Sequence, residues 1–181
     1  CLHRGLRCFR RGRPSRTWYA RSVIPIRLLP KSVMTILREA ARHALKRPVV
    51  GVCAAATAPD GRWLLIRRAD TGPWALPGGT VEWGETLRDT LVREVIEEAG
   101  IRETTFKRMV GVYSRPDRDP RFHAVTIVVE AEVGPIVQPP KNPVEIREAR
   151  VFLLTELPAE MAMGMRDFLD HALAGGAPAF E

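Results

Sequence analysis

The chain has 181 residues, of which 45% are hydrophobic and 27% charged. That size and composition suit one compact domain and exclude both a multidomain assembly and disorder over the whole length. The longest nearly apolar run, residues 49–58, is too short to cross a hydrocarbon core of roughly 30 Å, so we expect no membrane span and no membrane partner.

The formal net charge of +7 is concentrated at the N-terminus. Residues 1–38 contain ten Lys and Arg and no acid, whereas residues 39–181 hold 18 basic and 21 acidic side chains. A polyanionic partner could therefore engage only the N-terminal arm, and for the domain we do not expect nucleic acid as a partner.

The arm, residues 1–33, combines scattered Arg, Gly and Pro without a hydrophobic period, so it is not expected to pack by itself. Its composition is compatible with an Arg-rich transit peptide or a phosphate-binding arm, but not with a secretory signal, because Pro25 and Arg27 interrupt its apolar run. Since the chain begins with Cys and Met34 opens a helical pattern, we expect residues 1–33 to be extraneous and residues 34–181 to form the domain.

The three cysteines, Cys1, Cys8 and Cys53, include no C-x-x-C pair. Neither a disulfide framework nor a structural zinc site is predicted. This cysteine usage favours a reducing compartment, and we expect a cytoplasmic location. Cys53 lies within an apolar run and is interpreted as a small core residue rather than a reactive thiol.

The first half of the domain is predicted to contain a helix and a hairpin. Apolar residues recur at helical spacing over residues 32–47, which predicts a short packing helix. Residues 49–58 and 63–66 have the character of two strands, and the intervening Asp60-Gly61 accepts the positive φ that tight hairpins need.

The second half mixes strands and helices. Residues 69–84 are rich in Gly and Pro and predict a shaped loop. Residues 86–99 carry an apolar residue at every fourth position, which predicts an amphipathic helix ending at Gly100. Further strands are predicted at 106–114, 122–133 and 151–154, and a last helix at 161–173. Because these elements do not alternate regularly as βαβ units, the fold class is α+β.

Three carboxylates share one face of the helix predicted over residues 86–99. Glu94, Glu97 and Glu98 stand at i, i+3 and i+4. Like charges at i,i+4 cost roughly 0.2–0.5 kcal/mol, and acids in the last turn oppose the helix dipole by about 0.3–1 kcal/mol. One Arg93 cannot neutralise all three, and hard oxygen ligands suit Mg²⁺ or Mn²⁺. A solvated acidic face is the alternative interpretation.

The residues around this helix decide between the two interpretations. They reproduce the pattern G-x5-E-x7-R-E-U-x-E-E-x-G-U, where U is bulky and aliphatic, beginning at Gly79 and ending at Ile101. The chain therefore resembles the Nudix hydrolases, in order of elements from about Pro48 to Ala174. The resemblance implies a mixed β-sheet sandwiched between helices (α/β/α).

The resemblance implies hydrolysis of the diphosphate linkage of a nucleoside diphosphate derivative, a small nucleotide substrate, with Mg²⁺ as cofactor and Mn²⁺ as the alternative ion. The implied metal ligands are Glu94, Glu97, Glu98 and the carbonyl of Gly78. Glu94 or Glu98 would accept a proton from the attacking water, and family members differ in which does so. Arg93, linked to Glu85, would orient Glu94.

Residues 111–123 are similar to a stretch of ADP-ribose pyrophosphatase-like members, although Arg115 departs from the Asp of that branch. By this resemblance Arg121, His123 and Tyr113 are candidate substrate-binding residues. Each has a structural alternative: an ion pair of Arg121 with a loop Asp, a hydrogen-bonded strand His, and a Tyr in a strand core. Glu145 is a further, weaker candidate, because some members supply an extra carboxylate from a late loop.

Three alternatives to an ADP-ribose-like substrate remain open at this point. They are MutT-like sanitation of oxidised nucleoside triphosphates, nucleotide binding without cleavage, and processing of RNA ends with help from the basic arm. The intact carboxylate set disfavours binding without cleavage. A homodimer is common in the family, but no residue identifies an interface.

Overall fold

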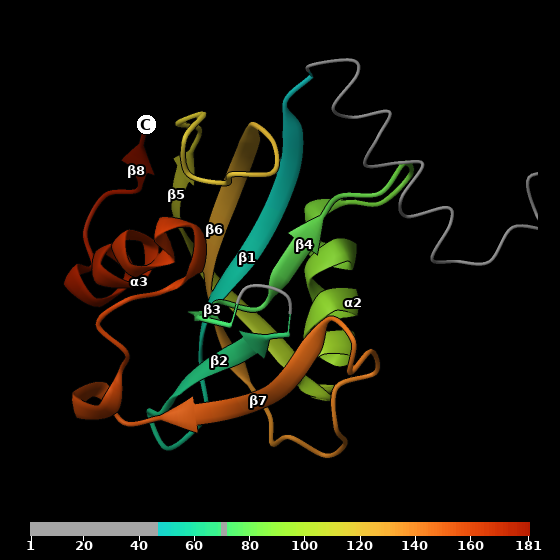
Figure 1. Cartoon of the computed structure of the whole chain (residues 1–181). Coiled ribbons are helices and arrows are strands. Elements are labelled where there is room, and N and C mark those ends of the chain that lie inside the picture. Colours follow the sequence, from blue (N-terminus) through green and yellow to red (C-terminus); the bar gives the residue numbers. More distant parts are fainter. Residues whose placement is uncertain (1–46, 70–71) are drawn as a thin grey trace, which may run out of the picture.

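The computed structural model describes residues 47–69 and 72–181. Within these ranges one mixed sheet lies between two helices, α2 (Leu87–Ala99) on one face and α3 (Met165–Ala174) on the other (Figure 1). This arrangement confirms the predicted α+β fold. The helix predicted over residues 32–47 and the arm, residues 1–33, lie outside the described residues.

The sheet is organised around strand β1. The strands described are β1 (Val49–Thr57), β2 (Trp63–Arg68), β3 (Trp74–Ala75), β4 (Gly78–Thr80), β5 (Thr104–Tyr113), β6 (Ala124–Val133), β7 (Ile146–Phe152) and β8 (Ala179–Phe180). Their order is β3-β2-β1-β6-β5-β8, with β4 also on β1 and β7 also on β2. β1 runs parallel to β6 over its whole length, from Val49 opposite Ala124 to Thr57 opposite Glu132.

β1 reads as a continuous apolar run because both of its faces are covered. Val52 and Ala54 belong to the core cluster beneath α2, whereas Cys53 and Ala55 belong to the cluster beneath α3. Cys53 is only 2% exposed, and burial raises the pKa of its thiol to about 12. The prediction of a core cysteine is therefore confirmed, and this burial disfavours a reactive thiolate.

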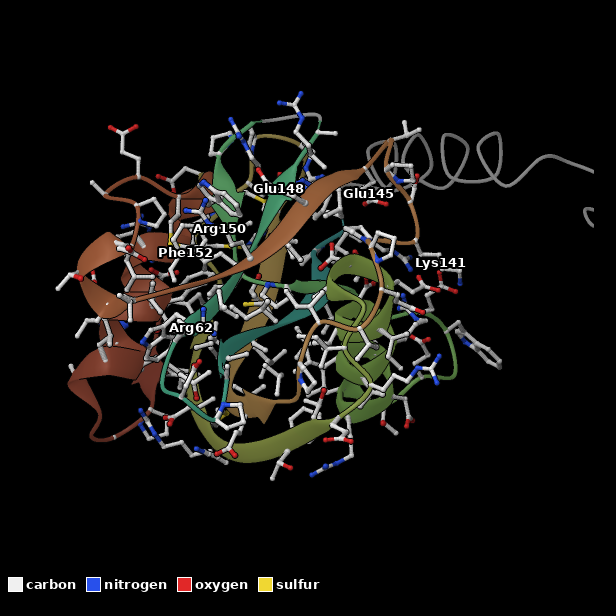
Figure 2. All side chains as sticks on the ribbon, turned by 90° about the horizontal axis from the view of Figure 1, so that it is seen from below. Arg62, Lys141, Glu145, Glu148, Arg150 and Phe152 are labelled. Atoms are coloured by element: carbon white, nitrogen blue, oxygen red, sulfur yellow. The ribbon has the colours of Figure 1, made fainter. Side chains whose placement is uncertain are left out.

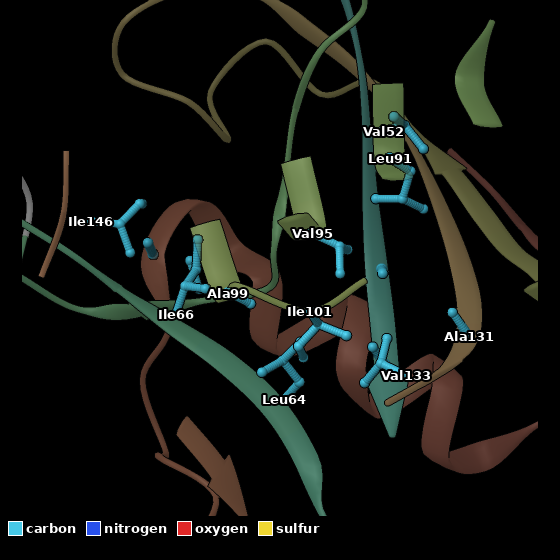
Figure 3. Close-up of a cluster of buried hydrophobic side chains, with 14 residues drawn as sticks. Val52, Leu64, Ile66, Leu91, Val95, Ala99, Ile101, Ala131, Val133 and Ile146 are labelled. Carbon is cyan, nitrogen blue, oxygen red and sulfur yellow. The ribbon is translucent and has the colours of Figure 1, made fainter. Parts of the chain in front are cut away.

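Helix α2 has the boundaries that its end signals predict. The Oγ1 of Thr86 accepts a hydrogen bond from the amide of Asp89 at 3.2 Å. The carboxylate of Asp89 in turn accepts one from the amide of Thr86, which completes a capping box. At the other end Gly100 adopts a left-handed φ of 65°. Between these caps Leu91, Val95 and their neighbours fill the core cluster shown in Figure 3, each such burial contributing about 1.5–3 kcal/mol.

Several predicted boundaries are wrong. The loop predicted over residues 69–84 contains β3 and β4, which are too short to show a period of their own. β7 begins five residues earlier than the predicted strand, because the charged residues in the first part of its sequence IREARVF interrupt the apolar pattern that would indicate a strand. α3 begins at Met165, after a 3-10 turn at Ala162–Gly164. β8 was not predicted at all.

No helix in residues 47–69 or 72–181 is both long and apolar enough to cross a membrane.

Candidate active site

A cavity of about 270 Å³ opens where β1 and β4 meet the C-terminal half of α2. The carboxylates Glu94 and Glu98 line one side of it, and Gly78 and Gly79 supply backbone between them and β1. Residues of the β5–β6 loop and of the turn before α3 line another side. The fold thus brings two of the three predicted carboxylates to a concave site.

The two glycines allow β4 to pass directly against α2. A Cβ on Gly79 would collide with the Glu94 carboxylate, and one on Gly78 would collide with the backbone of β1. The amide of Gly78 donates to Oε2 of Glu98 at 2.8 Å. The Gly-Gly pair therefore holds one carboxylate by a backbone N–H and leaves room for the other.

Burial sets the electrostatics of the pair. Glu98 is only 5% exposed, and desolvation, followed by the charge of Glu94, raises its pKa well above the usual range. Desolvation also raises the pKa of Glu94, despite the nearby Arg93. A buried and a partly buried carboxylate that resist ionising together are an incomplete charge arrangement, which a divalent cation would complete.

The oxygen donors fit a hard divalent ion such as Mg²⁺. As they stand, however, no three Asp, Glu, His or Cys side chains within the described ranges are gathered closely enough to hold one. Glu98 is instead bonded to a backbone amide and Glu94 to Arg93. Each of these bonds uses one oxygen of its carboxylate, so the second oxygen of each could hold an ion.

Arg93 links the carboxylate helix to the turn that precedes it. Its Nε and Nη2 donate to Glu85 at 2.8 and 3.0 Å, and its Nη1 donates to Oε1 of Glu94 at 2.7 Å. These hydrogen bonds lower the pKa of Glu85 to about 2, so that carboxylate stays ionised. The geometry is that of an orienting group, in which a planar fork fixes the direction of Glu94.

Arg93→Lys is expected to lower kcat by roughly tenfold, because an ammonium keeps the charge but cannot form the fork that joins Glu85 to Glu94. Steady-state kinetics at saturating metal would measure the loss. Arg62→Lys is the matched control, since Arg62 pairs with Asp60 on an exposed turn. Equal activity of the wild type and the Arg93 variant would contradict the orienting role.

Glu97, the third predicted metal ligand, points elsewhere. It does not line the cavity; its Oε1 accepts from Nζ of Lys141 at 2.6 Å. Arg93 is more distant, at 3.9 Å. Figure 2 shows Lys141 beside α2. The sequence did not predict this lysine as a partner, because nothing in a loop 44 residues downstream indicates that it returns to the helix.

The candidate substrate residues separate into two groups. Arg121 lines the cavity and also pairs with buried Asp119, at 2.8 Å, so both of its interpretations are compatible with the geometry. Tyr113 is only 1% exposed and packs under α3, where its hydroxyl contacts Nδ1 of His171 at 2.6 Å. His123 contacts the carbonyl of Ser114 at 2.8 Å. Neither Tyr113 nor His123 lines the cavity, so neither is carried into the proposed site.

Other residues of the cavity had not been singled out. Arg68, at the end of β2, is 8% exposed, and its Nη2 lies 3.7 Å from Oε1 of Glu145. Met163 and Met165 come from the segment that leads into α3. Glu145, by contrast, is the weakest candidate from the sequence; it immediately precedes β7 and lines the cavity (Figure 2). These contacts join segments far apart in the sequence, which explains why no local pattern revealed them.

Comparison with known proteins agrees with this architecture. The NUDIX domain profile matches residues 46–172. An ADP-ribose pyrophosphatase of Methanocaldococcus jannaschii is 44% identical over 102 residues, which are 55% of this chain and 59% of that protein. A MutT-like protein of Streptomyces ambofaciens is 46% identical over 69 residues, 38% of this chain and 44% of that one. The chain thus spans less than two thirds of the length of these relatives.

Solved structures show the same fold. A MutT NUDIX hydrolase from Burkholderia pseudomallei is 30% identical, with a TM-score of 0.57, and the match covers 69% of this chain and 98% of that one. An ADP-ribose pyrophosphatase from Streptococcus suis is 25% identical, with a TM-score of 0.58 and coverage of 74% and 98%. The chain belongs to the NUDIX domain family.

Proposed function

We propose that the protein is a Mg²⁺-dependent Nudix pyrophosphohydrolase that cleaves the diphosphate linkage of a nucleoside diphosphate derivative, with ADP-ribose as the first candidate substrate. The observation that carries this proposal is the pair of carboxylates of partly buried Glu94 and buried Glu98, held beside the cavity by Arg93 and by the amide of Gly78. Mn²⁺ is a second candidate ion.

The residues divide the work of the reaction. When bound, a divalent ion supplies the positive charge that a pyrophosphate and two carboxylates share. Glu94, Glu98 and the carbonyl of Gly78 would hold it, and Glu97 would join them only by leaving Lys141. Water attacks one phosphorus and its proton passes to Glu94 or Glu98, while the bridging P–O bond breaks and the second phosphate leaves.

Two features of the cavity support an ADP-ribose-like substrate. Arg121 places a guanidinium at the cavity, where it could contact a phosphate, and Phe122 places a ring there that could stack on a base. The M. jannaschii relative carries the same assignment by name. The alternative, MutT-like hydrolysis of oxidised nucleoside triphosphates, is supported by the name of the S. ambofaciens relative.

The products distinguish these two functions. ADP-ribose hydrolysis yields AMP and ribose 5-phosphate, whereas a nucleoside triphosphate yields a nucleoside monophosphate and pyrophosphate. The decisive experiment compares kcat/KM for ADP-ribose, nucleotide sugars, dinucleoside polyphosphates and 8-oxo-dGTP, with Mg²⁺ and with Mn²⁺. Turnover of none of them would overturn the proposed function. A cytoplasmic location and a homodimer also remain proposals, the first supported by the scarcity of cysteines.

Removal of residues 1–33 is expected to leave kcat/KM for a small nucleotide within about threefold, or about 0.7 kcal/mol. The reason is that Val49 and later residues already form a cavity within residues 47–69 and 72–181, and salt screens the arm's attraction for an anion over roughly 8 Å. Kinetics of the full and shortened chains at physiological salt would test this. A loss of tenfold or more in a normally folded protein would show that the arm contributes to the site.

A further inference from the structure

One wall of the cavity is built from segments that the sheet does not hold. Asp119, Arg121 and Phe122 come from the β5–β6 loop, and Met163 and Met165 come from the segment entering α3. Met163 has a φ of 55°, a left-handed conformation that a non-glycine residue rarely adopts. Such segments keep their position only if neighbouring contacts hold them.

Arg118, which is not among the residues that line the cavity, connects these two segments. Its side chain is only 9% exposed, although it belongs to a loop. Nη1 donates to Oδ2 of Asp167 on α3 at 3.1 Å and to the carbonyl of Gly164 at 3.4 Å. Its guanidinium also lies over the rings of Tyr113 and Phe168, at 5.3 and 5.1 Å from the centroids. The residue before Asp119 is thereby fixed to the residues after Met163.

The remaining donors of Arg118 go to Glu181. Nε donates to Oε2 at 3.0 Å and Nη2 to Oε1 at 2.6 Å, a bidentate pair. The same carboxylate accepts from the amides of Ser114 and Arg115 at 2.9 and 3.0 Å, so it also holds the start of the loop. Arg118 lowers the pKa of Glu181 to about 2, which keeps the pair ionised at neutral pH.

We infer that the Arg118–Glu181 pair positions the substrate wall of the cavity, so that these two residues set the affinity for substrate without touching it. The inference rests on the proposed function, because the affected step is binding of the nucleotide. The groups that Arg118 contacts lie on α3, β5, the turn before α3 and Glu181, and neither Glu94 nor Glu98 is among them. Loss of the pair should therefore weaken binding and leave the chemical step nearly unchanged.

The test compares Glu181→Gln and Arg118→Met with Asp60→Asn. The last variant breaks a similarly short pair with Arg62 on an exposed turn, where the acid is 52% exposed. For ADP-ribose with Mg²⁺, KM should rise about fivefold in the first two variants, kcat should stay within about twofold, and the control should keep both values. Arg118→Lys should recover only part of KM, because an ammonium lacks the fork.

Amide hydrogen exchange of the metal-free, substrate-free proteins supplies a readout that does not depend on activity. Residues 115–122 and 163–165 should exchange faster in Glu181→Gln, whereas α2 should exchange as in the wild type. Unchanged KM, unchanged exchange, or a loss of kcat and stability with KM unaltered would each overturn the inference. If Arg118→Met does not fold, Glu181→Gln decides, since it leaves Arg118 bonded to Asp167. If the wild type hydrolyses none of the tested compounds, the proposed function is wrong. The exchange rates would still show whether the Arg118–Glu181 pair holds residues 115–122 and 163–165 in place.

Discussion

Glu98→Gln is expected to lower kcat/KM by on the order of 10²-fold or more while the protein remains folded. Gln keeps the shape of the side chain but loses the charge that would anchor a divalent ion. Because Glu98 is 5% exposed, the charged form is costly when no ion is bound. The metal-free variant should therefore be at least as stable as the wild type.

Thermal unfolding with and without Mg²⁺ separates metal binding from folding. An ion that binds only the folded state raises Tm by mass action, so Mg²⁺ or Mn²⁺ should raise Tm more in the wild type than in Glu98→Gln. Glu132→Gln is the matched control, because that acid pairs with Lys107 on the surface. Wild-type turnover in the Glu98 variant, or equal Tm shifts, would remove Glu98 from the ligand set.

The carboxylate helix could be predicted from the sequence because its information is local. Thr86 caps the first turn of α2, and the left-handed Gly100 ends its last turn. The apolar residues that α2 buries lie within the helix itself. The Arg93–Glu85 link also followed from the family pattern, and the structure shows it at 2.8 Å. Contacts between residues of one short motif can thus be predicted from the sequence. The catalytic roles of these residues stay predictions.

The substrate wall of the cavity, formed by the β5–β6 loop and the segment entering α3, could not be predicted, because it depends on how segments distant in the sequence pack together. The strand character of residues 106–114 does not show which face of β5 packs against α3. Tyr113 lies on that face and is therefore buried. Likewise, the pairs of Arg118 with Glu181 and of Lys141 with Glu97 span 63 and 44 residues. An isolated charged residue in a loop carries no sign of its partner.

Gly78→Ala is expected to destabilise the protein by about 2 kcal/mol or more and to abolish most activity. An added Cβ would lie 2.5 Å from Cα and Cβ of Cys53 and still closer to the carbonyl oxygen of Val52. Those atoms belong to the central strand, which pairs on both sides and cannot move away, so the cost is that of overpacking a rigid core. Displacement of β4 would also withdraw the amide that holds Glu98.

Gly51→Ala provides the control for the Gly78 variant, because it adds the same methyl group to β1 itself. There the nearest atom is the carbonyl oxygen of Gly79 at 3.4 Å, an ordinary contact. Urea unfolding should therefore give a midpoint close to that of the wild type for Gly51→Ala and a clearly lower one, with an unchanged slope, for Gly78→Ala. If both variants unfold at the wild-type midpoint, β4 does not lie as tightly against β1 as the structure shows. The backbone support of Glu98 would then need another source.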